Sequence, residues 1–166
     1  MRFFIFFIIF VLLQKVFELW TDKSNERWLI QRGAVQVAEK HYKWFSSLHL
    51  LFFICMIIEV GWKIKGGTFW INWFFIFFFI LAQFSRGWCM SSLGRFWNTK
   101  LYVLHNVIVL KRGPYRLLQH PEYIVVFIEL LVIPLMFQAY ISAVVFPTLY
   151  IFVIMLRISE LEKLTE

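Results

Sequence analysis

Charged residues, glycine, proline and cysteine are all scarce in this sequence of 166 residues. Charged residues make up only 16% of the chain, which also has 7 glycines, 4 prolines and 2 cysteines. A soluble domain usually carries about a quarter charged residues, so this chain has too little polar sequence to coat a water-exposed surface. The charged residues are also confined to a few blocks. These deficits argue against a soluble domain and indicate an integral membrane protein with a single domain over residues 1–166.

The two cysteines and the missing sequence motifs argue against several kinds of site. Cys55 lies inside an apolar run and Cys89 near a membrane edge, without the spacing of a zinc site or a disulfide framework. We therefore predict no metal site. The sequence also has no Ser-His-Asp order, no glycine-rich phosphate loop and no Gly-x-Gly-x-x-Gly after a strand. A cofactor would then bind in a pocket at the membrane surface and not on a Rossmann sheet.

Apolar residues, by contrast, are abundant, since 61% of the chain is hydrophobic, 21% is aromatic and the mean hydropathy is +0.71. Three apolar runs of roughly 15–18 residues can each just span a hydrocarbon core of about 30 Å. They are Phe3–Phe17, Trp44–Val60 and Phe69–Phe84. No small-residue cleavage site follows the first run, so we interpret it as a retained signal-anchor helix. Gly66-Gly67 separates the second run from the third, and Ser85-Arg86-Gly87 is expected to end the third.

The fourth apolar stretch, Ile124–Leu156, is too long for one membrane crossing. As a single helix it would run about 50 Å, which exceeds the bilayer core. Gln138 and Tyr140 interrupt it near the middle, and Pro134 and Pro147 flank them. We therefore predict a helical hairpin with arms of about 15 residues each, or about 23 Å. The fold class that results is an all-α integral membrane protein with about five transmembrane helices.

Two polar segments connect these runs. Thr21–Lys43 interleaves charged and apolar residues, which suits a helix on the membrane surface, although a solvated loop fits it equally well. Trp88–Arg112 is expected to form an irregular surface cap or an interfacial helix. Within it, Leu101–Leu104 and Val107–Leu110 are short apolar pieces that suit short strands or extended segments. Gly113-Pro114 then forces a turn.

The net charge of +7 follows the membrane pattern and does not indicate nucleic-acid binding. Lys and Arg concentrate in Thr21–Lys43, Ser85–Glu122 and the C-terminal tail, whereas the opposite side receives Arg2, Lys63 and Lys65. The positive-inside rule then places the N-terminus outside and the C-terminus in the cytoplasm. Anionic lipid head groups are the expected partners of the basic residues.

The densest cluster of polar chemistry is Gly113–Tyr123, directly before the predicted hairpin. Its His120 can titrate near neutral pH or hydrogen-bond a ligand, although a plain helix start with an interfacial histidine is the alternative. Three charged residues follow the hairpin: Arg157, Glu160 and Glu162. A hairpin returns both of its ends to one membrane face. We therefore expect His120 and Tyr123 to lie close to this charged tail.

Glu129 lies within the first arm of the predicted hairpin. An ionisable side chain at the centre of a membrane costs about 2.5–3.5 kcal/mol on insertion scales, so it is a functional candidate by default. The alternative is a structural role, in which Glu129 pairs with Gln138, Asn72 or a basic residue that reaches inward.

The sequence of these motifs is similar to a known family. Gly113-Pro114-Tyr115-Arg116, His120-Pro121-Glu122-Tyr123, an apolar hairpin and then Arg157 with acidic residues resemble the C-terminal part of the isoprenylcysteine carboxyl methyltransferase family. Four earlier pieces resemble the short bacterial branch of that family, some members of which methylate alkylpyrone or phenolic lipids: Asn25-Glu26-Arg27-Trp28, His41-Tyr42, Leu48-His49 and Gly94-Arg95-Phe96-Trp97-Asn98.

The resemblance implies an S-adenosylmethionine-dependent O-methyltransferase of a bacterial cytoplasmic membrane, with its catalytic motifs in residues 94–166. The cofactor would enter from the cytoplasm, beneath a cytoplasmic cap. A lipophilic or prenylated acidic acceptor would enter from the bilayer. The resemblance implies that Tyr115, His120, Tyr123 and Glu162 bind the cofactor. Pro121 and Glu160, next to them in sequence, complete the predicted cofactor-binding set. The resemblance also implies that Arg157 holds the anionic acceptor or the cofactor carboxylate. Arg157 and Glu129, the latter chosen for its depth in the membrane, are the predicted catalytic residues.

Two other functions stay open at this point. Sterol-type membrane reductases share a similar C-terminal pattern but bind NADPH, and they are usually longer. A non-catalytic membrane scaffold or partner subunit is the second alternative. Gln119, where the family usually has Arg, slightly favours the scaffold. The identity of the acceptor and the oligomeric state do not follow from the sequence.

Overall fold

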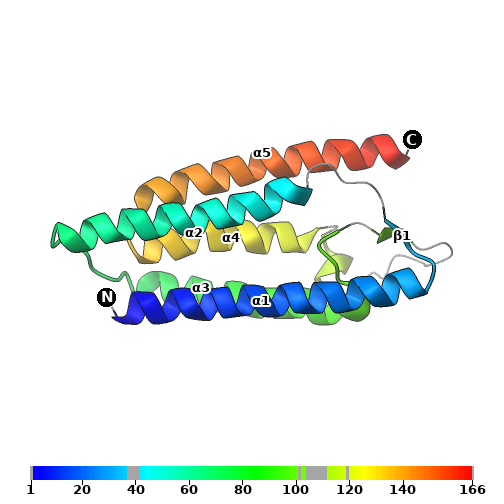
Figure 1. The fold of residues 1–166 in the computed structure, drawn as a ribbon, viewed down its shortest axis with the longest axis horizontal. Helices are drawn as coiled ribbons and strands as arrows, with labels where there is room; N and C mark the ends of the chain where they lie inside the picture. Colours follow the sequence, from blue (N-terminus) through cyan, green and yellow to red (C-terminus); the bar gives the residue numbers. More distant parts are fainter. Residues whose placement is uncertain (1, 37–41, 101, 104–111, 119, 166) are drawn as a thin grey trace.

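Five long helices make up most of the chain. The structure, a computed structural model, describes residues 2–36, 42–100, 102–103, 112–118 and 120–165. Figure 1 shows the helices running lengthwise beside one another, with the N-terminus and the α2–α3 connection at one end and the C-terminus and β1 at the other. The elements in chain order are α1 Arg2–Gln31, β1 Val35–Gln36, α2 Tyr42–Lys65, α3 Phe74–Leu93, η1 Gly94–Phe96, β2 Tyr102–Val103, η2 Gly113–Arg116, α4 Pro121–Met136 and α5 Tyr140–Thr165. The all-α membrane fold predicted from the sequence is confirmed.

The helices differ in length and in how much of their apolar surface is exposed. Four of them are long and apolar enough to cross a membrane: α1, α2, α3 and α5. Helix α4 has 16 residues, or about 24 Å of length. It packs against both α3 and α5 and buries Val125, Leu130 and Ile133 among other residues. The shortest helix is therefore largely covered by its neighbours, whereas the longer helices present exposed apolar side chains outward.

The predicted hairpin is present, but its second arm is longer than expected. The turn between α4 and α5 is at Phe137–Ala139, where Gln138 adopts a φ of 61°. Helix α5 then runs for 26 residues through Pro147 and on into the charged tail. The expected end of the arm near Leu156 was wrong, because the Glu, Leu and Lys residues after Arg157 are good helix formers.

Helix α1 is also longer than its apolar run. It continues for 30 residues, about 45 Å, so residues 21–31 form neither a separate surface helix nor a loop. Glu18, Asp22, Asn25 and Leu29 are buried at successive spacings of four, three and four residues, which places them on one helical face. That polar face packs against the chain after α3. The prediction missed it because only apolar residues were expected to form a buried face.

Helix α3 likewise does not end at Ser85-Arg86-Gly87. It continues to Leu93 and is terminated at Gly94, which has a φ of 54°. The Ser85 hydroxyl donates to the Leu81 carbonyl within the helix, and the Arg86 side chain is turned into the bundle. Polar residues here mark a buried contact and not a helix boundary.

The chain after α3 forms a polar cap, which we define as residues 94–100 and 102–103 together with the far end of α1 and β1. The Asn25 side chain donates to the Trp97 carbonyl at 2.7 Å, and the Thr99 amide donates to Asp22 at 2.6 Å. Lys100 pairs with Glu26 at 2.7 Å. β1 pairs antiparallel with β2, with Val35 opposite Val103. The strand expected within Leu101–Leu104 therefore exists at Tyr102–Val103, whereas Val107–Leu110 lies outside the described residues.

Exposed tryptophans mark both ends of the apolar surface. Trp20, Trp44 and Trp88 are exposed on α1, α2 and α3 toward the cap, and Trp62, Trp70 and Trp73 are exposed toward the opposite end. Tryptophan is enriched at membrane interfaces. The 18 residues from Trp44 to Trp62 correspond to about 27 Å of helix, close to the thickness of a hydrocarbon core. We call Trp20, Trp44 and Trp88 the cap-side tryptophan belt.

Candidate functional site

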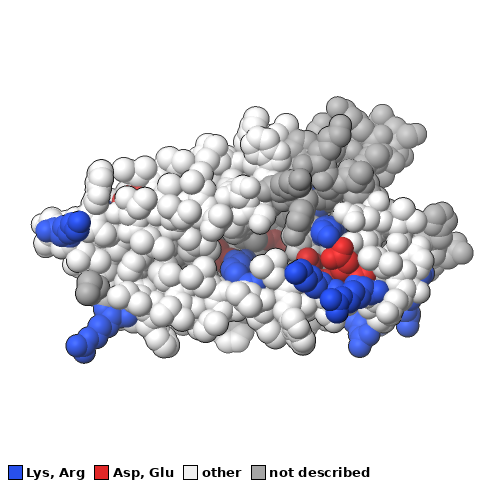
Figure 2. All heavy atoms as spheres, in the orientation of Figure 1, with Lys and Arg blue, Asp and Glu red and all other residues white. Residues whose placement is uncertain are grey.

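A cavity of about 410 Å³ lies where the five helices meet the cap. Its volume falls in the range of about 300–1,000 Å³ that is usual for ligand pockets. Figure 2 shows the molecule hollowed on this face, with basic and acidic side chains inside the hollow. Apolar side chains such as Leu12, Leu50 and Val126 form walls on the membrane side, and polar residues such as Asn98 and Thr99 lie on the cap side. An apolar chamber with a few converging polar groups suits an amphipathic ligand.

One wall of the cavity carries an aromatic and basic cluster from both ends of the hairpin. The rings of His120 and Tyr123 stack with centroids 5.0 Å apart and an interplanar angle of 18°. The Arg157 guanidinium lies 5.7 Å from the centroid of the Tyr123 ring and donates to the Thr99 carbonyl at 2.9 Å. All three residues line the cavity. Arg157 lies 37 positions after His120 and 34 positions after Tyr123 in the sequence, yet all three side chains meet on one surface.

Glu122 supplies the acidic group of this wall. Its Oε1 lies 3.3 Å from His120 Nδ1. Its other oxygen, Oε2, is buried and makes no hydrogen bond of ordinary geometry within the described residues. The buried hydroxyl of Tyr115 interacts with this carboxylate and with the Cys89 thiol, although neither contact has ordinary hydrogen-bond geometry. Burial and the nearby Glu122 carboxylate raise the pKa of the Tyr115 phenol, so this side chain stays a neutral donor.

The floor of the cavity is a charged network centred on Arg86. Its Nε donates to Glu129 Oε1 at 2.8 Å, and its second terminal nitrogen contacts Glu129 Oε2. Its first terminal nitrogen donates to both oxygens of Glu18, at 3.0 and 2.9 Å. The side chains of Arg86, Glu18 and Glu129 are only 11%, 10% and 7% exposed. Buried charges in proteins are tolerated when they are paired and hydrogen-bonded in this way.

Three more side chains complete this network. Lys15 donates to Glu18 Oε2 at 3.0 Å. Gln83 donates to Glu129 at 3.1 Å and accepts from Gln14 at 2.7 Å. Two basic and two acidic residues therefore balance, and helices α1, α3 and α4 are joined through polar side chains near the cap-side end of the bundle.

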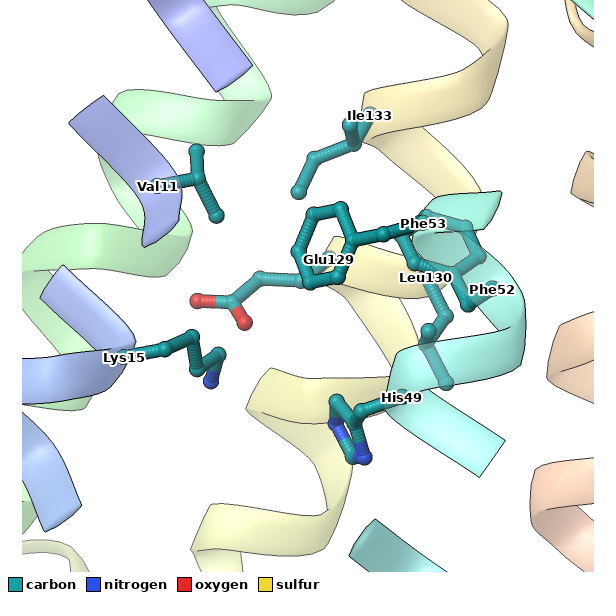
Figure 3. Close-up of a pocket in the computed structure, with 8 residues that line it drawn as sticks. All are labelled: Val11, Lys15, His49, Phe52, Phe53, Glu129, Leu130 and Ile133. Carbon is teal, nitrogen blue, oxygen red and sulfur yellow. The ribbon is translucent and has the colours of Figure 1, made fainter. Parts of the chain in front are cut away.

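A small pocket adjoins the floor, with a volume of about 10 Å³, close to what one water molecule needs. Figure 3 shows Lys15 from α1 and His49 from α2 reaching into the space beside the Glu129 carboxylate of α4. Lys15 and His49 line the large cavity as well. The two spaces therefore share one boundary, which α1 and α2 supply from opposite sides.

The sequence-predicted site residues separate into four groups. His120, Tyr123 and Arg157 line the cavity together, as the hairpin prediction required. Glu129 lies beneath it, held by Arg86, which matches the structural alternative of a basic residue reaching inward. Tyr115 packs against Ala82, Cys89 and Val125, and Pro121 is buried at the start of α4. Glu160 and Glu162 lie on α5, and their side chains fall outside the described part of the structure.

Sequence reasoning missed the floor of the site. It singled out neither Glu18 nor Lys15, and it interpreted Arg86 as the end of an apolar run. It named Glu122 of the wall only as part of the family motif. A usable signal was present. Gln14 in the first run pairs with Glu18 directly after it, and Gln83 in the third run pairs with Arg86 just after it, both at helical spacing. Polar residues that share a face within an apolar helix are expected to find partners on other helices.

The fold and the cavity together define a membrane-embedded protein with a pocket that is apolar on one side and polar on the other. Comparison with known proteins identifies the family. A family model for the isoprenylcysteine carboxyl methyltransferase (ICMT) family matches residues 74–165. The chain belongs to this family, which confirms the resemblance seen in the motifs. Membership implies a membrane methyltransferase in general terms.

Two relatives in bacteria extend the similarity to nearly the whole chain. The chain is 36% identical over 157 residues to the Bacillus subtilis (strain 168) "Uncharacterized protein YpbQ", covering 94% of this chain and 92% of the relative. It is 25% identical over 156 residues to an "Uncharacterized protein" of Haemophilus influenzae, covering 92% and 89%. No solved structure matches the chain.

Proposed function

We propose that this protein is an S-adenosylmethionine-dependent O-methyltransferase that acts on a lipophilic acidic acceptor, of the isoprenylcysteine-carboxylate or alkylpyrone and phenolic-lipid type. One observation carries the proposal: His120, Tyr123 and Arg157 converge on a cavity of about 410 Å³ that has apolar walls on its membrane side. A polar wall suits a charged cofactor, and an apolar wall suits a lipid. The family membership supports the reaction class.

The residues present fit the chemistry of the proposed cofactor. S-adenosylmethionine supplies an activated methyl group on a positively charged sulfur. The stacked rings of His120 and Tyr123 offer flat aromatic faces for a base or a cation. Glu122 lines the cavity and also interacts with Tyr115, and a carboxylate accepts several hydrogen bonds, so it suits ligand hydroxyl or amino groups. Arg157 suits a carboxylate.

The protein contributes orientation and exclusion of water. A carboxylate or an acidic enol is already a good nucleophile when ionised, so alignment with the methyl group supplies most of the rate. Arg157 is 8% exposed and fixed by the Thr99 carbonyl, which holds its guanidinium plane. Glu129 is proposed to act through Arg86 as a positioning residue, since its carboxylate is bonded to that guanidinium. Glu160 and Glu162 stay predicted cofactor contacts.

The proposed location is a bacterial cytoplasmic membrane, with the N-terminus outside and the cap and C-terminus in the cytoplasm. The end of the molecule that carries the cap also carries most of the Lys and Arg residues. The positive-inside rule puts such an end in the cytoplasm, where the cofactor is available. Anionic lipid head groups are the proposed partners of the exposed basic residues.

His120→Ala and Arg157→Lys test the proposal together. If His120 contacts the cofactor, His120→Ala weakens binding of S-adenosylmethionine. If Arg157 orients the acceptor, Arg157→Lys keeps the charge but loses the planar fork, so turnover falls more than cofactor affinity does. The measurements are calorimetry of cofactor binding and single-turnover methyl transfer in lipid nanodiscs. Leu117→Ala and Arg112→Lys are matched controls, because both residues are exposed and neither lines the cavity.

Other outcomes favour other functions. Binding of NADPH without binding of S-adenosylmethionine would indicate a reductase. A folded protein that binds neither cofactor and transfers no methyl group would indicate a scaffold. If Arg157→Lys binds cofactor poorly but reacts normally once saturated, Arg157 is a cofactor ligand and not the acceptor-orienting residue. Labelled methionine fed to cells with and without the protein, followed by lipid extraction, identifies the acceptor.

A further inference from the structure

A buried carboxylate on α1 contacts the residue that holds Arg157. Asp22 is 3% exposed, and its Oδ1 accepts from the Thr99 amide at 2.6 Å. The same carboxylate also interacts with the Thr99 hydroxyl. The carbonyl of Thr99 in turn accepts from a terminal nitrogen of Arg157 at 2.9 Å. Thr99 therefore lies directly between an anion of α1 and a cation of α5.

Side chains, and not a helix or a strand, fix the described segment 98–100. The Lys100 amide donates to Asn98 Oδ1 at 2.8 Å, and the Asn98 side chain donates to the Asp22 carbonyl at 3.2 Å. The Thr99 carbonyl and the Lys100 amide belong to one planar peptide group, so the bond to Asn98 also fixes that carbonyl. Asp22 is thus bound to this segment through both its carboxylate and its carbonyl.

The orientation of Arg157 depends on this segment. Arginine has a long side chain with many rotamers, so its guanidinium is fixed only where contacts hold it. Arg157 is 8% exposed and contacts the face of the Tyr123 ring, 5.7 Å away, as well as the Thr99 carbonyl. A ring face attracts a cation over a broad area, whereas a hydrogen bond has a preferred direction. The Thr99 carbonyl therefore sets the direction of the guanidinium plane.

A neighbouring residue of α1 anchors the cap at other positions. Asn25 is buried like Asp22 and lies on the same helical face. It donates to the Trp97 carbonyl at 2.7 Å and to the Gly94 carbonyl at 3.4 Å. Both residues therefore hold the cap, but Asp22 is the one bonded to Thr99. This difference separates an effect on Arg157 from an effect on the cap as a whole.

We propose that Asp22 is a positioning residue for Arg157 and acts through Thr99, so that a residue of α1 sets the direction from which Arg157 meets the acceptor. Asp22 lies outside residues 74–165, the part of the chain that the family model matches. The inference rests on the proposed function for what Arg157 binds, but the contacts from Asp22 to Arg157 require neither cofactor nor acceptor. Without the Asp22 carboxylate, the Thr99 backbone turns and the Arg157 guanidinium turns with it.

Single-turnover methyl transfer in nanodiscs tests this role, with S-farnesyl-N-acetylcysteine and a long-chain alkylpyrone as acceptors. Asp22→Ala should lower turnover about tenfold while the affinity for S-adenosylmethionine changes little, because a misaligned guanidinium affects the acceptor and not the cofactor. In an Arg157→Ala background the same substitution should lower turnover by less than about twofold, because the effect passes through Arg157. Equal losses in the two backgrounds would overturn the proposal.

Two further variants separate positioning from loss of the cap. Asp22→Asn keeps an oxygen that accepts from the Thr99 amide, so it should fold and should lose less turnover than Asp22→Ala. Asn25→Ala removes a cap bond of similar length, and its effect on turnover should be the same with and without the Arg157 side chain. A coupling of Asn25 to Arg157 as large as that of Asp22 would overturn the assignment to Asp22.

A measurement without substrate separates this inference from the proposed function. Nitrogen-15 NMR of the arginine side chains in micelles reports how fast each guanidinium rotates, and the Arg157 signal is the one lost in Arg157→Ala. Asp22→Ala should speed the rotation of Arg157, whereas Asn25→Ala should not. An unchanged Arg157 signal in Asp22→Ala would overturn the positioning role. If the signal changes as expected but the wild-type protein transfers no methyl group, the positioning role stands and the proposed function fails.

Discussion

At the scale of single residues, Arg86 explains how charges persist inside this bundle. A guanidinium stays ionised and presents five donors in a fixed plane. Arg86 donates hydrogen bonds to two carboxylates from different helices, Glu18 of α1 and Glu129 of α4. One cation thus holds two anions, and Lys15 restores neutrality. The network therefore ties α1, α3 and α4 together beneath the cavity.

Arg86→Gln should destabilise the protein strongly. It leaves Glu18 and Glu129 buried without their shared cation, and breaking a buried pair from one side costs about 3–5 kcal/mol. Glu129→Gln should cost less, because Arg86 keeps both bonds to Glu18 and a glutamine oxygen can still accept. Thermal unfolding in detergent measures both. A Glu129→Gln variant as unstable as Arg86→Gln would contradict this ranking.

Glu129→Gln also tests the positioning role, because it is expected to fold. If Glu129 holds Arg86 at the cavity floor, the variant should change turnover or the preference among lipid acids while cofactor affinity stays the same. Kinetics across several acceptors make the comparison. Unchanged kinetics for every acceptor would leave Glu129 with a structural role alone.

Gly113 is a residue for which only glycine fits. Its φ is 53°, and a Cβ built there would lie 2.1 Å from the Ser92 hydroxyl oxygen on α3. Gly113→Ala should therefore combine backbone strain of about 1–2 kcal/mol with an overpacking cost of about 1–3 kcal/mol. Gly67→Ala is the matched control, since Gly67 has a φ of 69° but open space around its Cα. Melting temperatures of the two variants should separate by the overpacking cost, and equal losses would contradict the close approach.

At the scale of the elements, the sequence predicted where helices cross the membrane better than where they end. The apolar runs and the Gln138 turn are each found in the structure. Helices α1 and α3 extend past the predicted ends because their later residues bury polar faces against the cap and the bundle. Where these two helices end depends on partners about 70 residues away in the sequence, as in the bond of Asn25 to Trp97. No local sequence pattern predicts such partners. The position of β1 was not predicted for the same reason, since this two-residue strand exists only through its pairing with β2.

The start of α5 provides a test at this scale. Glu59 of α2 accepts from the amides of Ile141 and Ser142, each at 2.9 Å, and from the Ser142 hydroxyl at 2.8 Å. A carboxylate from one helix thus caps the N-terminus of another. Glu59→Ala should cost about 1–2 kcal/mol in stability, and Ser142→Ala should cost less because it removes one bond of three. Protease protection of the α4–α5 turn should fall in Glu59→Ala first, and an unaffected turn would contradict the capping role.

At the scale of the whole molecule, the two ends differ in charge and in content. The N-terminus, the α2–α3 connection and the α4–α5 turn share one end, and the cap and the C-terminus share the other (Figure 1). Reporter fusions should therefore place Gly66 and Arg112 on opposite sides of the membrane, with Arg112 in the cytoplasm. Both reporters on one side would contradict the fold, and Gly66 in the cytoplasm would contradict the proposed orientation alone.

The site itself was predictable in the part that the hairpin creates. His120, Tyr123 and Arg157 could be expected together because a hairpin must bring its ends to one face, and the structure places all three in the cavity lining. The contact between Glu18 and Arg86 joins residues 68 positions apart on helices that are not neighbours in sequence. Their pairing depends on the rotation of each helix about its axis, which side-chain packing decides. The floor of the site was therefore not predictable from the motifs.

The pairing of Lys15 with Glu18 on a single helix has a consequence for how the chain is made. A nascent chain enters the membrane helix by helix, so α1 arrives long before α3 and α4 exist. An ionised side chain becomes more costly as it lies deeper in lipid. Because Lys15 lies three residues before Glu18, at 3.0 Å, the first helix leaves the translocon already neutral at this point. Arg86 then joins with α3 and Glu129 follows with α4, so the order of synthesis matches the order in which the charges find their partners.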